Sequence, residues 1–217
     1  MYYIIGTPIN WVASQITGYL GGLDRSQLLF YGAIIGILSS IDYGGAINKV
    51  VFAFVFTLFS EQIYEPITVL ILASMVTPFG LTMAYFIGKV FGKNIFNKQE
   101  VETLKTAFPM GVCQITEGCF PIVLNDLFKN VIATGVGGAV GGALSMLWGA
   151  DSHIPASGMF AVFTMTRPWA FIGALLLGSL ATAITILILR PQVDPEAEVV
   201  IQEVEEDELS WDDLKIS

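Results

Sequence analysis

One carboxylate, Glu117, stands in an apolar stretch between two prolines, with the polar side chains of Thr116 and Gln114 beside it. A carboxylate at bilayer depth costs about 2.5–3.5 kcal/mol on insertion scales, so such residues usually face a cavity and a partner. Its two oxygens can accept hydrogen bonds from hydroxyl groups, and these charge-assisted bonds are about twice as strong as neutral ones. These three residues therefore predict a binding site for a neutral, hydroxyl-rich ligand. The alternative is a structural ion pair of Glu117 with Lys105 or Lys129.

Two further polar groups are candidates for the same site. His153 is the only histidine and follows Asp151 closely. Asp42 and Asn48 lie within eight residues of each other and of Lys49, among apolar neighbours. His153, Asp42 and Asn48 are therefore predicted to contact the ligand. Each also has a structural interpretation: a hydrogen-bonding histidine, and an Asp42–Lys49 ion pair that steadies a helix junction.

The sequence lacks the motifs of most catalytic chemistry. It contains no P-loop, no dinucleotide fingerprint, no nucleophile elbow and no metal-ligand spacing. Its two cysteines, Cys113 and Cys119, lie in an apolar stretch and are interpreted as packing residues. We therefore predict no catalytic residue, no metal and no cofactor. Any phosphoryl donor must come from a partner.

The composition is that of a membrane protein. Hydrophobic residues make up 54% of the 217 and charged residues only 13%, whereas soluble domains carry roughly 25% charged residues. Ten of the 19 acidic residues lie in 191–217, which hold one of the ten basic residues. The remainder is neutral overall and has no basic stripe, so nucleic-acid binding is not expected.

Long apolar runs predict an all-α integral membrane protein with several spans. A spanning helix needs about 20 apolar residues. The candidate runs are 27–41, 49–59, 66–90, 131–148 and 169–189, of which the first two are short. The organisation predicted is an amphipathic, interfacial segment over 1–26, a membrane region over 27–190 and an acidic, disordered, cytoplasmic tail over 191–217.

Two stretches inside the membrane region, 109–124 and 152–163, are too short and too rich in Pro and Gly to span as helices. Irregular backbone is tolerated at membrane depth only inside protein or beside a wet cavity. We predict re-entrant hairpins or broken helices there, and paired interruptions of this kind indicate a transporter's binding site. The glycine-rich run 131–148 provides either a packing face within the chain or a contact for a second copy or a sliding domain.

Basic residues indicate the orientation of the chain. Lysines concentrate around 91–105, and Arg190 follows the last apolar run. Cytoplasmic loops are enriched in Lys and Arg, so the loop around 91–105 and the C-terminal tail are predicted to lie inside. Residues 60–65 carry two acids and no base, which predicts the outer side.

Four short runs resemble a known family. Residues 115–121 (ITEGCFP) resemble the "ITEGAIPF" motif of the fructose-type (fructose/mannitol-like) enzyme IIC of the phosphoenolpyruvate-dependent sugar phosphotransferase system. Residues 42–49 (DYGGAINK) resemble its "FDMGGPVNKAA" motif, 141–146 (GGALSM) its "TGALSM" run and 6–9 (GTPI) its "GKPIA" motif. The order and approximate spacing agree. The chain thus resembles the C-terminal two-thirds of that subunit.

The resemblance implies a permease in the bacterial inner (plasma) membrane that binds fructose or a fructose-like sugar. A cytoplasmic enzyme IIB, itself phosphorylated by enzyme IIA, would phosphorylate the sugar from its phosphocysteine. Glu117 would hold the hydroxyl that is phosphorylated, and an elevator-type domain would slide against a homodimeric scaffold. The family's histidine motif, "APHGG", aligns with 155–158 (PASG), which has no histidine. A truncated or split, non-transporting subunit that needs a second polypeptide, such as an N-terminal IIC half, is therefore the alternative.

Overall fold

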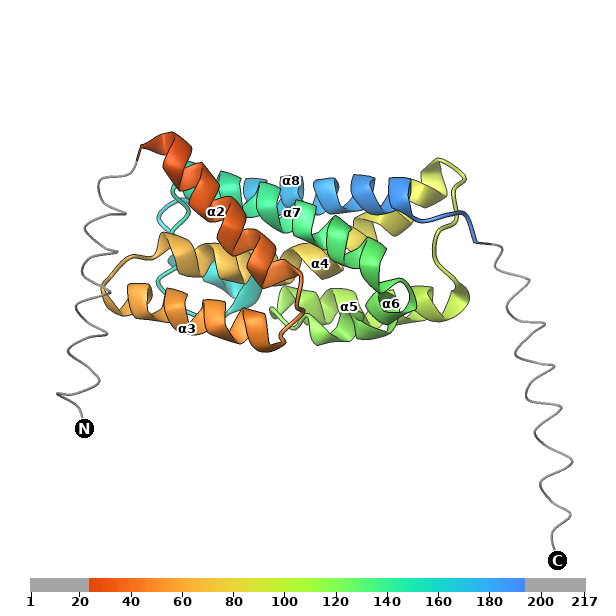
Figure 1. The fold of residues 1–217 in the computed structure, drawn as a ribbon, viewed down its shortest axis with the longest axis horizontal. Coiled ribbons are helices and arrows are strands. Elements are labelled where there is room, and N and C mark those ends of the chain that lie inside the picture. Colours follow the sequence, from red (N-terminus) through yellow and green to blue (C-terminus); the bar gives the residue numbers. More distant parts are fainter. Residues whose placement is uncertain (1–23, 194–217) are drawn as a thin grey trace, which may run out of the picture.

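A computed structural model describes residues 24–193, and these form an all-helical bundle (Figure 1). The elements are α2 (Arg25–Ser40), α3 (Ala46–Ser60), α4 (Glu65–Val90), α5 (Lys98–Val112), η1 (Glu117–Cys119), α6 (Phe120–Asn125), α7 (Leu127–Trp148), η2 (Gly158–Thr164) and α8 (Pro168–Leu189). The predicted all-α class is confirmed. The interfacial segment over 1–26, the motif at 6–9 and the acidic tail beyond residue 193 lie wholly or mainly outside the described residues.

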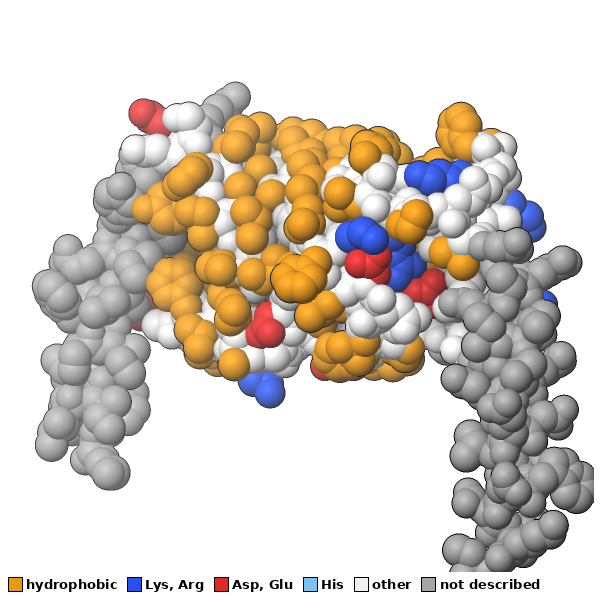
Figure 2. Space-filling model, turned by 45° about the vertical axis from the view of Figure 1, so that its right-hand side comes forward, with side chains coloured by type: hydrophobic (Ala, Val, Ile, Leu, Met, Phe, Trp, Pro, Cys, Tyr) orange, Lys and Arg blue, Asp and Glu red, His pale blue; other side chains and the backbone are white. Residues whose placement is uncertain are grey.

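Three helices in the described range are long and apolar enough to cross a membrane, namely α4, α7 and α8. The shorter α2 and α3 are joined by a tight turn about halfway along the bundle (Figure 1). Hydrophobic side chains cover the middle of the face drawn in Figure 2, and most of its charged side chains lie toward one end. An apolar middle between polar ends is the surface that a bilayer requires.

The glycines of α7 form a packing face within the chain. Gly138 lies so close to Gly36 of α2 that a Cβ on it would overlap the Gly36 carbonyl oxygen. Gly142 meets Gly32 in the same way one turn further on. Small residues let two helix backbones approach this closely without a hydrophobic driving force. The interpretation as an internal packing face is confirmed for these residues.

A methyl group at Gly138 is therefore expected to destabilise the bundle more than one at Gly135 of the same helix. An added Cβ at Gly138 meets Ser40 and the fixed backbone of Gly36, whereas at Gly135 the nearest neighbour is a methyl carbon of Ile41 at 3.2 Å. Overpacking of this kind costs about 1–3 kcal/mol. Thermal unfolding in detergent should show a lower midpoint for G138A than for G135A. Equal midpoints would contradict the tight α2–α7 contact.

The first predicted interruption is present, but it begins later than its sequence suggests. Helix α5 continues through Pro109 to Val112, and only then does the chain turn back into η1 and α6. Gln114, with φ of 66°, ends the helix, and the Ile115 amide donates back to the carbonyl of Met110. Residues 109–112 are therefore helical, and the break between α5 and η1 falls at 113–116, inside the stretch 109–124. A proline removes one helical hydrogen bond, and the packing of Gly111 against Pro78 of α4 holds the last turn of α5 in place.

The second predicted interruption lies between α7 and α8. Helix α7 ends at Gly149, whose φ of 65° is a left-handed cap, and an irregular loop leads to η2. The amide of Ser152 donates to the Thr68 hydroxyl of α4 at 2.7 Å, so this loop is fixed to a membrane-length helix.

A buried ion pair closes one end of the bundle. An Arg190 guanidinium nitrogen lies 2.9 Å from a Glu100 carboxylate oxygen, and these side chains are only 5% and 4% exposed. Arg190 also donates to the carbonyls of Ile95 and Ile122, and Glu100 accepts from the Asn125 amide. The ion pair and its hydrogen bonds therefore join the end of α8 to both helices of the hairpin, α5 and α6.

Candidate binding site

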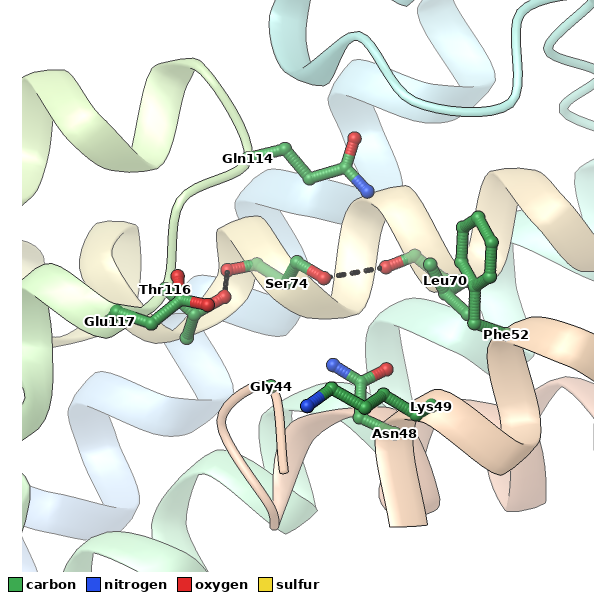
Figure 3. Close-up of a pocket in the computed structure, with 9 residues that line it drawn as sticks. All are labelled: Gly44, Asn48, Lys49, Phe52, Leu70, Ser74, Gln114, Thr116 and Glu117. Carbon is green, nitrogen blue, oxygen red and sulfur yellow. Dashed lines mark hydrogen bonds between the residues drawn. The ribbon is translucent and has the colours of Figure 1, made fainter. Parts of the chain in front are cut away.

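Two irregular turns, the helices α3 and α4 and the start of η1 surround a pocket of about 170 Å³ near the turn between α2 and α3 (Figure 3). The lining residues are Gly44, Asn48, Lys49, Phe52, Leu70, Ser74, Gln114, Thr116 and Glu117. Clefts that hold drug-sized molecules occupy roughly 300–1,000 Å³, so this pocket fits a smaller ligand.

Glu117 reaches the pocket at the end of the α5–η1 turn, where it faces Gly44. A Cβ at Gly44 would lie 2.9 Å from a Glu117 carboxylate oxygen, and Gly44 has a φ of 92°. Glycine is therefore suited to this position for its conformation and for the space it leaves. The neighbouring Tyr43 donates or accepts a 2.8 Å hydrogen bond with Thr134 and packs edge-on against Phe120. These contacts join the α2–α3 turn to α7 and to the Glu117 hairpin.

The carboxylate of Glu117 has no ion-pair or hydrogen-bond partner among residues 24–193. Lys105 pairs with Glu102, and Lys129 pairs with Asp126 at 2.7 Å. The alternative of a structural ion pair to either lysine was therefore wrong. Glu117 is an exposed residue that lines the pocket, and both of its carboxylate oxygens can accept hydrogen bonds from a ligand.

Thr116 and Gln114 fix the turn that carries Glu117. The buried Thr116 hydroxyl donates to the Ser74 carbonyl of α4 at 3.2 Å. The Gln114 side-chain oxygen accepts from the amides of Ser157 and Gly158, each at 3.1 Å. The two interrupted stretches, 109–124 and 152–163, are therefore in contact. The side-chain nitrogen of Gln114 makes no hydrogen bond within the described part of the chain. The Gln114 side chain lines the pocket (Figure 3).

The first turn of α3 supplies the opposite wall. The side-chain oxygen of Asn48 is buried and has no hydrogen-bond partner among the described residues. An unsatisfied buried acceptor costs about 1–3 kcal/mol, so this oxygen is a polar group that the described contacts leave unexplained. Lys49 and Phe52 line the pocket beside it.

Asp42 does not line the pocket. Its carboxylate accepts hydrogen bonds from the amides of Ile47 at 2.6 Å and Asn48 at 3.4 Å. It therefore caps the amides that the first turn of α3 leaves unpaired. The Asp42–Lys49 ion pair, the structural alternative, is absent from the ion pairs of the described region.

His153 is also not among the pocket-lining residues. Its Nδ1–H donates to the Thr164 carbonyl at 2.9 Å, and its ring centroid lies 4.4 Å from that of Tyr64. These contacts hold the α7–α8 loop against the start of α4. Of the six predicted ligand-binding residues, the structure thus brings Glu117, Thr116, Gln114 and Asn48 together.

Sequence reasoning missed Leu70, Ser74 and Phe52 as lining residues. They lie on apolar helices, where a single inward-facing residue has no distinguishing pattern. For Ser74 the only signal is a small polar residue within the long apolar run of α4.

Comparison with curated proteins finds relatives that are components of the sugar phosphotransferase system. The chain is 31% identical over 196 residues to the fructose-specific EIIB'BC component of the phosphotransferase system of Haemophilus influenzae, covering 90% of this chain and 34% of that protein. It is 32% identical over 195 residues to the fructose-specific EIIC component of Haloferax volcanii, covering 89% and 51%. It is 29% identical over 202 residues to the 2-O-alpha-mannosyl-D-glycerate-specific EIIABC component of Escherichia coli, covering 89% and 30%.

The chain thus spans between 30% and 51% of the length of these relatives. No family model matches it, and no solved structure matches it. The matches cover about 90% of the chain, and the aligned relatives are components of one transport system. The chain therefore belongs to the fructose-type EIIC family of the sugar phosphotransferase system.

Proposed function

We propose that this chain is the sugar-binding part of a membrane permease, which takes up fructose or a fructose-like sugar for phosphorylation by an EIIB partner. The observation that carries the proposal is the unpaired carboxylate of Glu117 in a small pocket beside the unpaired oxygen of Asn48. The relatives' names supply the sugar class.

The pocket offers hydrogen-bonding groups that suit a neutral sugar. The oxygens of Glu117 and Asn48 accept from hydroxyl groups, and the Gln114 amide nitrogen donates to one. Phe52 and Leu70 provide apolar surface for the sugar's C–H groups. Polar groups placed on an apolar wall are how small-molecule sites fix orientation.

Glu117 also suits the chemistry of phosphoryl transfer, a role that goes beyond the sequence-based prediction of ligand binding alone. The sugar hydroxyl loses its proton to the Glu117 carboxylate while its oxygen forms a bond to the phosphorus of a phosphocysteine on EIIB. The sulfur–phosphorus bond breaks, and the cysteine leaves as a thiolate. A positioned general base contributes about 10²–10⁴-fold to such a rate.

The orientation follows from the distribution of basic residues. One end of the bundle holds Lys93, Lys98 and Arg190. There the Arg190 guanidinium donates to the Ile95 carbonyl and the Lys93 ammonium to the Leu187 carbonyl, which joins the end of α8 to the α4–α5 loop. By the positive-inside rule this end faces the cytoplasm of a bacterial inner membrane, with EIIB and EIIA. A homodimer with an elevator-type movement of the sugar-binding part completes the proposal.

The proposal predicts fructose phosphorylation that depends on phosphoenolpyruvate. Membranes from cells that make the natural protein containing this chain, supplied with its EIIB and EIIA proteins, should convert labelled fructose into fructose phosphate. Membranes without the chain should not. Mannosylglycerate and mannitol, tested in parallel, report which sugar the pocket prefers.

Two results would count against the proposal. Flux of free fructose without a phosphoryl donor would indicate a channel or secondary carrier. Absence of both binding and phosphorylation, with the protein correctly inserted, would favour the non-transporting subunit.

A further inference from the structure

Lys49 is a cation in a pocket whose proposed sugar is neutral. Among the nine lining residues, all in the described part of the chain, it is the only cation. Its side chain runs from α3 along the pocket wall toward Gly44, on the side opposite Thr116 and Glu117 (Figure 3). It forms no ion pair or hydrogen bond with any other described residue.

The structure removes two simpler roles for this lysine. Lys49 does not neutralise Asp42, because that carboxylate is taken up by the amides of Ile47 and Asn48. Nor does it pair with Glu117, although both line one pocket. Since Asp42 occupies the amides at the start of α3, the helix end itself offers little to an anion. The positive charge of this wall therefore belongs to Lys49.

The charge in the pocket changes during the reaction. A free sugar brings no charge, whereas a phosphate monoester carries about −1.5 to −2 at neutral pH. Once Glu117 has released the proton that it takes from the sugar hydroxyl, its carboxylate would repel that phosphate unless a cation lay near it. An ammonium group is a compact donor of three hydrogen bonds and is used widely to bind phosphate.

We propose that Lys49 is a phosphate-binding residue, which receives the phosphoryl group as it joins the sugar and holds the sugar phosphate before release. This inference rests on the proposed function of the pocket. The transfer is the one described above: the sugar oxygen–phosphorus bond forms, the sulfur–phosphorus bond of the EIIB phosphocysteine breaks, and the hydroxyl proton goes to Glu117. Lys49 keeps its own proton throughout and contributes its charge.

The test separates binding of the sugar from binding of its phosphate. Three variants of the natural protein, K49Q, K49R and K105Q, are compared with the wild type in membranes. Affinities are measured for fructose and, separately, for the 1- and 6-monophosphates of fructose, and the phosphorylation rate is measured with EIIB and EIIA. Lys105 is the matched control because it is an exposed lysine that pairs with Glu102 outside the pocket.

We expect K49Q to bind fructose within about twofold of the wild type, which also reports that it is folded. Its affinity for the phosphate ester and its phosphorylation rate should each fall about 10- to 100-fold, the scale of one lost hydrogen bond to a charged group. K49R should recover most of both, and K105Q should change neither.

The inference is overturned if K49Q weakens fructose and its phosphates equally, or changes neither affinity nor rate. It is overturned in a different way if the wild type binds neither fructose nor its phosphates, because the pocket would then not be a sugar site. Loss of phosphate binding with fructose binding retained is the result that supports it.

Discussion

Glutamine in place of Glu117 is expected to lower fructose phosphorylation by about 10²–10⁴-fold, the contribution of a positioned general base. The variant E117Q keeps the size and shape of the side chain and removes its negative charge. Fructose affinity should fall by about 10- to 100-fold as well, because a hydrogen bond to a charged group contributes about 1.5–3 kcal/mol. Equilibrium binding to membranes and the initial rate of phosphorylation check the two effects separately.

The matched control for E117Q is E102Q. Glu102 is also a carboxylate of the α5 hairpin, but its side chain is 69% exposed, it pairs with Lys105 and it lies outside the pocket. This control should retain both affinity and rate. If E117Q behaved like E102Q, the pocket would not be the sugar site, whatever the family of the chain.

Removal of Arg190 is expected to produce the largest loss of stability. The variant R190M leaves Glu100, which is 4% exposed, without its cation. Breaking a buried ion pair from one side costs about 3–5 kcal/mol, since the remaining charge stays buried. Thermal unfolding in detergent should therefore show a strongly lowered midpoint for R190M.

Two further variants distinguish this cause from a general loss of packing. Adding E100Q to R190M removes the unpaired charge and should restore part of the lost stability, a coupling that a double-mutant cycle measures. K105M breaks the exposed Lys105–Glu102 pair, which should cost no more than about 1 kcal/mol. If R190M were as stable as K105M, the buried pair would have no structural role.

The class of the fold followed from the sequence because membrane helices have a strong compositional signal. Runs 66–90, 131–148 and 169–189 correspond closely to α4, α7 and α8, and the two interruptions were found from proline and glycine. The sequence did not say where within 109–124 the chain reverses: Pro109 is accommodated within α5, and the reversal depends on Gln114 adopting a positive φ. No residue-type pattern distinguishes these two outcomes.

The candidate site was predicted only in part, for physical reasons. Glu117 was conspicuous because a charge among apolar residues is rare. Asp42 looked equally conspicuous, yet its charge is used within its own turn as a helix cap. His153 differs from both, because its place depends on how the α7–α8 loop folds against Tyr64. The Glu100–Arg190 pair was missed because its partners are separated by 90 positions.

That separation of 90 positions has a consequence for how the protein is made. At about 5–20 residues per second, a ribosome completes Arg190 roughly 5–20 s after Glu100. During this interval the nascent chain already contains the Glu100 carboxylate but lacks the Arg190 guanidinium that will pair with it. The α5–α6 hairpin must therefore remain near the aqueous boundary or the insertion machinery during this time. It can pack into the bundle with its charge paired only after α8 and Arg190 have been synthesised.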